Sequence, residues 1–121
     1  MADQLPQKTE KPWGYELLWA LTPRYAGKVL FVRQGQRLSF QFHRSKDESM
    51  YVYQGKVRLE TARPGGPRQT RLFEAGQSVH LPPGTRHRIE AIEDTYLLEV
   101  STPELEDVVR LEDDYGRADR G

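Results

Sequence analysis

The sequence predicts an all-β fold made of short antiparallel strands. Turn signals built from glycine, proline and aspartate recur along it, mostly about eight to eleven residues apart, a spacing typical of such strands. The segments between the turns are rich in Val, Leu, Tyr and Phe, and none carries a sustained helical period. Many short strands with glycine turns and no helix indicate a β-sandwich or a small barrel.

Nine strands are expected between these turns. In chain order they are residues 15–19, 29–33, 38–43, 50–54, 57–61, 70–73, 78–81, 87–91 and 96–100, and the turns fall at Gly27, Gly35, Gly55, Gly65, Gly66, Gly76, Pro82, Pro83, Gly84 and Asp94. If the side chain of Glu48 points inward, strand alternation turns Met50 and Val52 inward as well. Tyr51 and Tyr53 then point outward.

A chain of 121 residues fits one small domain. We expect a single domain over residues 1–121, with a mobile polar start at 1–10 and a charged C-terminal tail at 113–121. Neither end is expected to carry chemistry. Only 36% of the residues are apolar, which is little for a self-sufficient core. Together with the outward tyrosines, this composition predicts a homodimer that associates through an outer sheet face.

Composition excludes several classes of function. The chain has 18 basic and 18 acidic residues and no net charge, so it has no electrostatic footprint for nucleic acid or an anionic membrane. Because cysteine is absent, there is no disulfide and no thiolate nucleophile, and any metal must take nitrogen and oxygen donors. The start lacks an apolar export core, and no apolar run approaches the roughly 20 residues of a spanning helix. We therefore expect a soluble cytoplasmic protein.

The most informative pattern lies in residues 41–87. It reads Gln41-x-His43-x4-Glu48-x6-Gly55, followed by Gly76-x5-Pro82-x-Gly84-x2-His87. Two imidazoles, a carboxylate and an amide oxygen form a donor set that suits a borderline or moderately hard divalent metal. Gln41 and His43 are two apart on a strand and face the same way. Glu48 and His87 arrive from other strands, so the pattern predicts one metal site in a barrel interior, with Gln41 as the weakest ligand.

This pattern resembles the two motifs of the cupin family, the first with two His and a Glu, the second with a His after a Pro-x-Gly turn. Gln41 stands where the first His is usual, and Ala91 stands where an Asn is usual. Gln-x-His-x4-Glu is similar to the phosphomannose isomerase branch, in which a glutamine oxygen takes that ligand position. Three further stretches are similar to that branch: Lys11-Pro-Trp-Gly-Tyr-Glu16, Gly35-Gln-Arg-Leu-Ser39 and Val108-Val-Arg-Leu-Glu-Asp-Asp-Tyr-Gly-Arg117.

The resemblance extends over residues 11–117 and implies a double-stranded β-helix, the cupin jelly-roll barrel. It is nearest to the C-terminal cupin domain of bifunctional mannose-1-phosphate guanylyltransferase and mannose-6-phosphate isomerase proteins. It implies a divalent metal, zinc before manganese, iron, cobalt or nickel, with the ligands Gln41, His43, Glu48 and His87. It also implies an aldose–ketose isomerase that acts on a phosphorylated sugar.

A sugar phosphate needs cationic partners for its dianion. Arg33 is the first candidate, because its family counterpart is generally basic and its strand is expected beside the site, with an ordinary surface arginine as the alternative. Lys46 is the second candidate. Glu99 lies in an otherwise apolar strand, where a structural salt bridge is the first expectation and a catalytic base is the second. His80 is expected to serve in packing, in the core or at the surface, rather than at the site.

Two other functions stay open. His43, Glu48 and His87 also form the two-histidine, one-carboxylate set of Fe(II) dioxygenases. A non-catalytic cupin would bind a sugar or a metal without turnover. The fold cannot separate these functions, because one scaffold hosts many activities.

Overall fold

The predicted all-β architecture is confirmed in the computed structural model, which describes residues 4–119. Eleven strands and no α-helix occur in that range. The strands are β1 (Gln7–Lys11), β2 (Gly14–Leu21), β3 (Ala26–Val32), β4 (Phe40–Phe42), β5 (Glu48–Gln54), β6 (Lys56–Ala62), β7 (Gln69–Glu74), β8 (Ser78–Leu81), β9 (Arg86–Ala91), β10 (Thr95–Ser101) and β11 (Val109–Glu112). No helix in residues 4–119 is long and apolar enough to cross a membrane.

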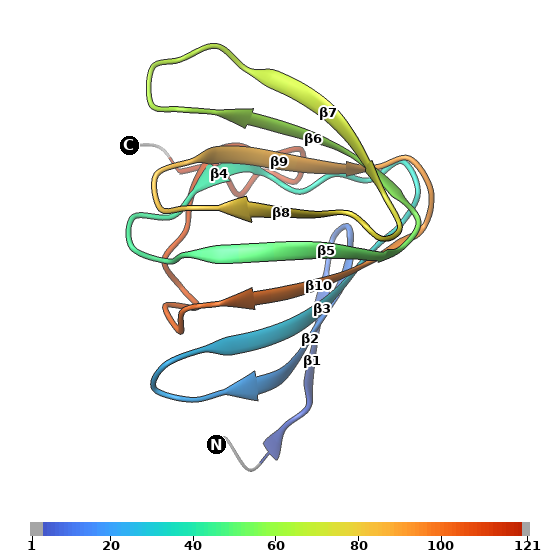
Figure 1. Cartoon of the computed structure of the whole chain (residues 1–121), viewed down its shortest axis with the longest axis vertical. Coiled ribbons are helices and arrows are strands. Elements are labelled where there is room, and N and C mark those ends of the chain that lie inside the picture. Colours follow the sequence, from blue (N-terminus) through green and yellow to red (C-terminus); the bar gives the residue numbers. More distant parts are fainter. Residues whose placement is uncertain (1–3, 120–121) are drawn as a thin grey trace.

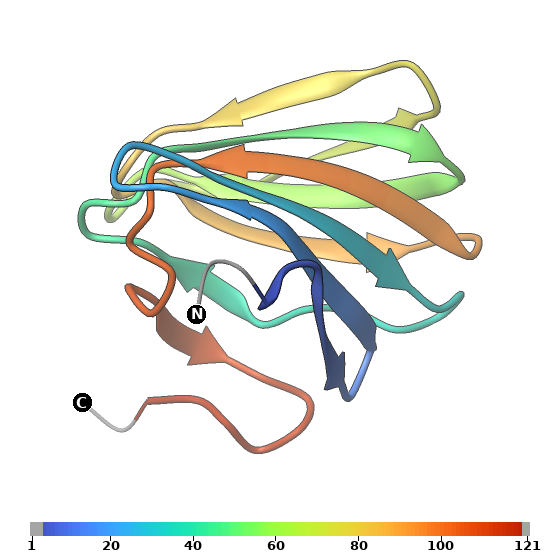
Figure 2. The ribbon, with the colours of Figure 1, turned by 90° about the horizontal axis from the view of Figure 1, so that it is seen from below.

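The strands form two antiparallel sheets, a six-stranded one in the order β1-β2-β3-β10-β5-β8 and a five-stranded one in the order β11-β4-β9-β6-β7. Figure 1 shows the two runs of strands one above the other, with β7, β6, β9 and β4 in one and β8, β5, β10, β3 and β2 in the other. In Figure 2 the C-terminal segment leaves β10 and turns back, so that β11 lies beside β4. This return brings residues near the C-terminal end of the chain to the space between the sheets.

The core lies between the sheets and is built mainly from alternate residues of the inner strands. Its largest fully buried side chains include Leu30, Leu81 and Leu97. In β5 the prediction of alternation is confirmed: Glu48, Met50 and Val52 are buried, whereas Tyr51 and Tyr53 are 40% and 62% exposed. The expected dimer through this outer face stays a prediction.

The turn between β5 and β6 shows why glycine is needed at position 55. Gly55 has a φ of +106°, which other residues rarely adopt. A Cβ there would lie 2.6 Å from the carbonyl oxygen of Asp94 and 2.8 Å from Cα of Thr95. The close approach of these two turns fixes the course of β5, and therefore the position of Glu48 at its start.

The nine expected strands correspond to β2 through β10, and the differences lie at the two ends. The structure pairs β1 with β2 where residues 1–10 were expected to be mobile; residues 1–3 lie outside the described range. Because β1 is polar and exposed, it has no alternation to reveal it, and only backbone pairing defines it. β11 precedes the expected charged tail. In that tail Arg117 pairs with Asp113, and residues 120–121 lie outside the description.

Candidate metal centre

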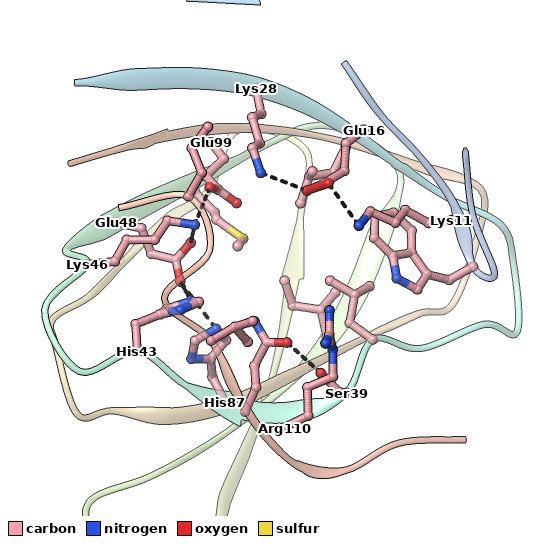
Figure 3. Close-up of a pocket in the computed structure, with 18 of the residues that line it drawn as sticks. Lys11, Glu16, Lys28, Ser39, His43, Lys46, Glu48, His87, Glu99 and Arg110 are labelled. Atoms are coloured by element: carbon pink, nitrogen blue, oxygen red, sulfur yellow. Dashed lines mark hydrogen bonds and ion pairs between the residues drawn. The ribbon is translucent and has the colours of Figure 1, made fainter. Parts of the chain in front are cut away.

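A cavity of about 100 Å³ lies between the sheets. Figure 3 shows the side chains around it. Eight charged residues contribute to its wall, five basic and three acidic: Lys11, Glu16, Lys28, Lys46, Glu48, Glu99, Arg110 and Arg117. Gln41, His43 and His87 line it as well. The cavity is therefore polar and has an excess of basic groups.

Three of the predicted metal ligands converge at one side of this cavity. His43 follows β4, Glu48 begins β5 and His87 lies in β9, so three separate strands deliver them. Their ligand atoms all lie within 4.8 Å of one another. The three side chains are 5%, 2% and 3% exposed, respectively, which leaves them little contact with water.

The protonation of both rings follows from their backbone contacts. Nδ1 of His43 lies 2.5 Å from the carbonyl oxygen of Asp107, and Nδ1 of His87 lies 3.0 Å from that of Thr85. A carbonyl can only accept a hydrogen bond, so Nδ1 of each ring carries the proton and donates it. Each Nε2 then presents a lone pair to the cavity, as is usual for a histidine that binds a metal.

These lone pairs face the carboxylate of Glu48 with no proton between them. Nε2 of His43 and Nε2 of His87 lie 2.8 and 3.3 Å from Oε2 of Glu48. Although they lie this close, Nε2 of His43, Nε2 of His87 and Oε2 of Glu48 are buried without a hydrogen-bond partner among the described residues. Three unpartnered buried acceptors pointing at one another are unfavourable unless a cation lies among them. The residues therefore fit a divalent metal.

Electrostatics agree with an anionic centre that attracts a cation. Burial opposes ionisation of Glu48, but His43, His87 and Lys46 outweigh it and hold the pKa of this carboxyl well below its usual range. Burial alone would lower the pKa of His43, but the nearby carboxylate of Glu48 outweighs burial, so the pKa of His43 is raised. A proton and a metal cation thus compete for the same point.

Gln41 lines the cavity next to this centre. It is the residue of β4 that pairs with His87 of β9, so the two side chains project to the same face. Its Oε1 accepts a hydrogen bond from the hydroxyl of Ser39. One of the two lone pairs of the amide oxygen is therefore engaged, and the role of Gln41 as the weakest ligand stays a prediction.

Lys46 and Glu99 form a buried ion pair on the cavity wall. Nζ of Lys46 lies 3.0 Å from Oε2 of Glu99 and 3.7 Å from Oε1 of Glu48. Burial, and then Glu48, raise the pKa of Glu99, although Lys46 opposes them. Glu99 therefore forms the expected salt bridge and also lines the cavity.

Two other candidates lie away from the cavity. Arg33 follows the last residue of β3 and is exposed, and its carbonyl accepts a turn hydrogen bond from Gln36. Leu30 and Val32 of β3 point into the core, so alternation turns Arg33 outward, and Arg33 is not among the residues that line the cavity. His80 lies at the surface, where its Nε2 is 2.7 Å from Oδ1 of Asp47.

The ends of the chain provide cavity residues that were not predicted. Lys11 belongs to β1, and Arg110 and Arg117 come from the C-terminal segment. Of the three, Arg117 lies in the tail that was expected to lack chemistry. Glu16 of β2 holds two lysines, with Lys28 at 2.9 Å and Lys11 at 3.3 Å. Burial opposes ionisation of Glu16, but these lysines outweigh it and lower its pKa. In the sequence, the family-like stretches 11–16 and 108–117 were the features that could have pointed to these cavity residues.

Asp107 is a further unpredicted residue, and it links the C-terminal segment to the centre. Its carboxylate accepts backbone hydrogen bonds from Arg44, Ser45 and Lys46 at 3.1, 2.7 and 2.9 Å. Its carbonyl oxygen orients the ring of His43. Asp107 therefore fixes the turn between two metal ligands, and these hydrogen bonds lower its pKa.

We expect Asp107→Ala to weaken metal binding about tenfold, because residues that orient a ligand typically contribute that much to affinity. Competition with a chromophoric chelator measures the change. Glu106→Ala is the matched control, since Glu106 is exposed and lies beside Asp107. Equal affinities in the two variants would mean that the turn does not position His43.

The two sheets and the His–Glu–His cluster between them define a cupin domain with a candidate metal centre. The chain belongs to the mannose-6-phosphate isomerase C-terminal family, whose model matches residues 2–113. The xanthan biosynthesis protein XanB of Xanthomonas campestris is 30% identical over 122 residues, which cover 92% of this chain and 24% of XanB. Mannose-1-phosphate guanylyltransferase ManC of Salmonella typhimurium is 35% identical over 113 residues, 88% of this chain and 22% of ManC. The chain spans less than a quarter of the length of these two relatives.

Solved structures show the same fold. KdgF from Halomonas sp. superposes with a TM-score of 0.70 at 22% identity and covers 81% of this chain and 86% of its own. CapF from Staphylococcus aureus superposes with a TM-score of 0.71 at 21% identity and covers 88% of this chain and 34% of its own. Oxalate decarboxylase from Bacillus subtilis, which has Mn(II) centres, superposes with a TM-score of 0.76 at 21% identity. The match covers 87% of this chain and 30% of the decarboxylase chain. These likenesses confirm the predicted jelly roll.

Proposed function

We propose that this domain is a metal-dependent isomerase that interconverts an aldose phosphate and a ketose phosphate, as mannose-6-phosphate isomerase does. One observation carries the proposal: a single cavity joins the His–Glu–His centre to a buried carboxylate, Glu99, and to a wall with excess positive charge. Isomerisation needs a cation, a proton acceptor and a binding surface for an anionic sugar. The cavity places side by side the residues that would hold the cation, a carboxylate and a basic wall.

His43, Glu48 and His87 would hold the metal, and Gln41 lies where it can complete the ligand set. When bound, a divalent cation supplies Lewis acidity that polarises the sugar carbonyl or the adjacent hydroxyl. Zinc is our first choice for two imidazoles and a carboxylate. Manganese is the next, because a structural neighbour, oxalate decarboxylase, has Mn(II) centres.

Glu99 is the proposed base, and Lys46 holds its carboxylate in place. A carboxyl whose pKa is raised by burial is a better proton acceptor than an exposed one. In the proposed reaction Glu99 takes the proton from C2 and returns it to C1, while the hydroxyl proton of O2 passes to O1. The interconversion is therefore balanced without an oxidant or a further substrate.

Charge and the relatives support the proposed substrate class. A wall with five basic and three acidic groups suits a phosphate dianion better than a neutral sugar. The family is described by mannose-6-phosphate isomerase, and ManC is named for mannose 1-phosphate. A phosphorylated aldose such as mannose 6-phosphate is our first candidate.

An Fe(II) dioxygenase is the second candidate function, because two histidines and one carboxylate are the protein ligands that such enzymes use. A sugar- or metal-binding cupin without turnover is the third. Oxygen uptake by the Fe(II)-loaded protein would favour the dioxygenase. A sugar that binds without reacting would favour the third function.

For an isomerase, we expect the metal-loaded protein to exchange the C2 proton of mannose 6-phosphate with deuterated solvent, since enediol formation makes that proton labile. Proton NMR follows the loss of the C2 signal, and exchange reports even a slow or poorly matched substrate. Chelator-treated protein is the control. If no aldose phosphate exchanges with Zn, Mn, Co or Fe supplied, the isomerase proposal is wrong.

A further inference from the structure

The basic residues of the cavity differ in whether they already have an acidic partner. Lys11 and Lys28 share Glu16, and Lys46 pairs with Glu99. The guanidinium of Arg117 forks onto Asp113, with both contacts at 2.9 Å. Among residues 4–119, the side chain of Arg110 alone of the five has no hydrogen-bond or ion-pair partner.

β11 turns Arg110 toward the metal ligands. Arg110 lies directly opposite Gln41 of β4, and Gln41 lies opposite His87 of β9. Residues directly opposite on antiparallel strands project to the same face, so these three form one row across the inner surface of the sheet. Strands lie about 4.8 Å apart, which separates Arg110 from His87 by about 10 Å at the backbone. Figure 3 shows Arg110 on the same wall of the cavity as Ser39 and His87.

The backbone of Arg110 is held in place from the far side. Its N–H donates to Oδ2 of Asp119 at 3.0 Å, and its carbonyl accepts from the N–H of Asp119 at 2.8 Å. Two hydrogen bonds to one residue fix the position from which the side chain extends. The guanidinium therefore enters the cavity from an anchored backbone with its donors unused.

We infer that Arg110 is the phosphate anchor of this cavity and binds the phosphate group of a sugar whose carbonyl end lies toward His43, Glu48 and His87. The identity of the ligand as a sugar phosphate rests on the proposed function. A planar guanidinium presents two parallel donors to phosphate oxygens, a geometry that an ammonium group lacks. Each of the other four cations is already in contact with a carboxylate, so Arg110 can bind a phosphate without breaking an existing ion pair.

Titration calorimetry with two probes tests this inference. Inorganic phosphate is titrated into metal-free protein, and mannose 6-phosphate into zinc-loaded protein. We expect Arg110→Gln to weaken both interactions roughly 10- to 100-fold, the effect of losing a charge-assisted hydrogen bond. Arg110→Lys keeps the charge without the fork and should lose less. Arg33→Gln is the matched control, since Arg33 is an exposed arginine outside the cavity, and it should bind both probes as the wild type does.

The inference is overturned if the wild type binds neither probe, if Arg110→Gln binds them unchanged, or if Arg33→Gln loses as much. Zinc content and circular dichroism show whether each variant keeps its centre and fold, and Arg110→Lys carries the test if Arg110→Gln does not fold. If both probes bind in an Arg110-dependent way but C2 exchange is not detected, the isomerase proposal is wrong and the role of Arg110 as phosphate anchor is retained. If Arg110→Gln keeps both C2 exchange and its affinity for the two probes, the isomerase proposal is retained and the inference about Arg110 is wrong.

Discussion

Replacing His87 with alanine should abolish metal binding and leave the domain folded. The substitution removes one of the three unpartnered buried atoms that converge at the centre. We expect the affinity to fall by more than about 100-fold, since even residues that only orient a ligand contribute 10- to 100-fold. The core, by contrast, is distributed over many strands and does not depend on this imidazole. Wild-type protein should retain about one divalent ion per chain after dialysis, and His87→Ala less than a tenth of that.

Thermal unfolding gives a second readout of the same change. A metal present at 100 times its dissociation constant stabilises the folded state by about 2.7 kcal/mol, which for a domain of this size raises the Tm by roughly 10 °C. That rise should appear in the wild type and vanish in His87→Ala. His80→Ala is the matched control, because His80 is exposed and lies outside the cavity. A variant at position 87 that keeps its metal would show that the centre is misassigned.

Gln41 should behave differently from the histidines. Its amide oxygen already accepts a hydrogen bond from Ser39, so the cavity does not leave it as an unpartnered atom. The difference illustrates how far spacing alone reaches. Two residues of separation on a strand correctly place Gln41 and His43 on one cavity, but they do not reveal the hydroxyl that competes for the amide.

The interior strands could be predicted because alternation and turn residues agree there. Glu48, Met50 and Val52 point inward as the pattern requires, and Gly55 occupies a turn that no other residue fits without strain. The strands at the ends could not be predicted in this way. β1 has no apolar alternation; it is an edge strand of the six-stranded sheet and pairs with β2.

Arg33 and Arg110 show the limit for the binding site. Arg33 was chosen because its family counterpart is generally basic and its strand was expected beside the site, but β3 ends one residue before it and the residue is exposed. Arg110 is separated from Gln41 by most of the sequence and reaches it only because the chain returns along β4. Register between strands distant in sequence is a tertiary property, so the pattern of one segment does not contain it.

Glu99→Gln should reduce C2-proton exchange by at least about 100-fold while the metal content stays unchanged. Removal of a general base typically costs 10²- to 10⁴-fold, and glutamine keeps the shape and part of the hydrogen bonding of the side chain without accepting a proton. Glu99 is not among the three converging ligands, so the centre should survive. The rate of exchange per bound metal is therefore the quantity to compare.

Glu16→Gln provides the matched control for Glu99→Gln. Both carboxylates line the cavity and both are held by lysine, so loss of a charge or of a lysine partner affects them alike. They differ in their pKa: burial raises that of Glu99, whereas the two lysines outweigh burial and lower that of Glu16. A base that exchanges a carbon-bound proton benefits from the higher pKa, so we expect Glu16→Gln to lose less than about tenfold. Equal losses in the two variants would indicate that charge balance in the cavity, and not proton transfer by Glu99, limits the reaction.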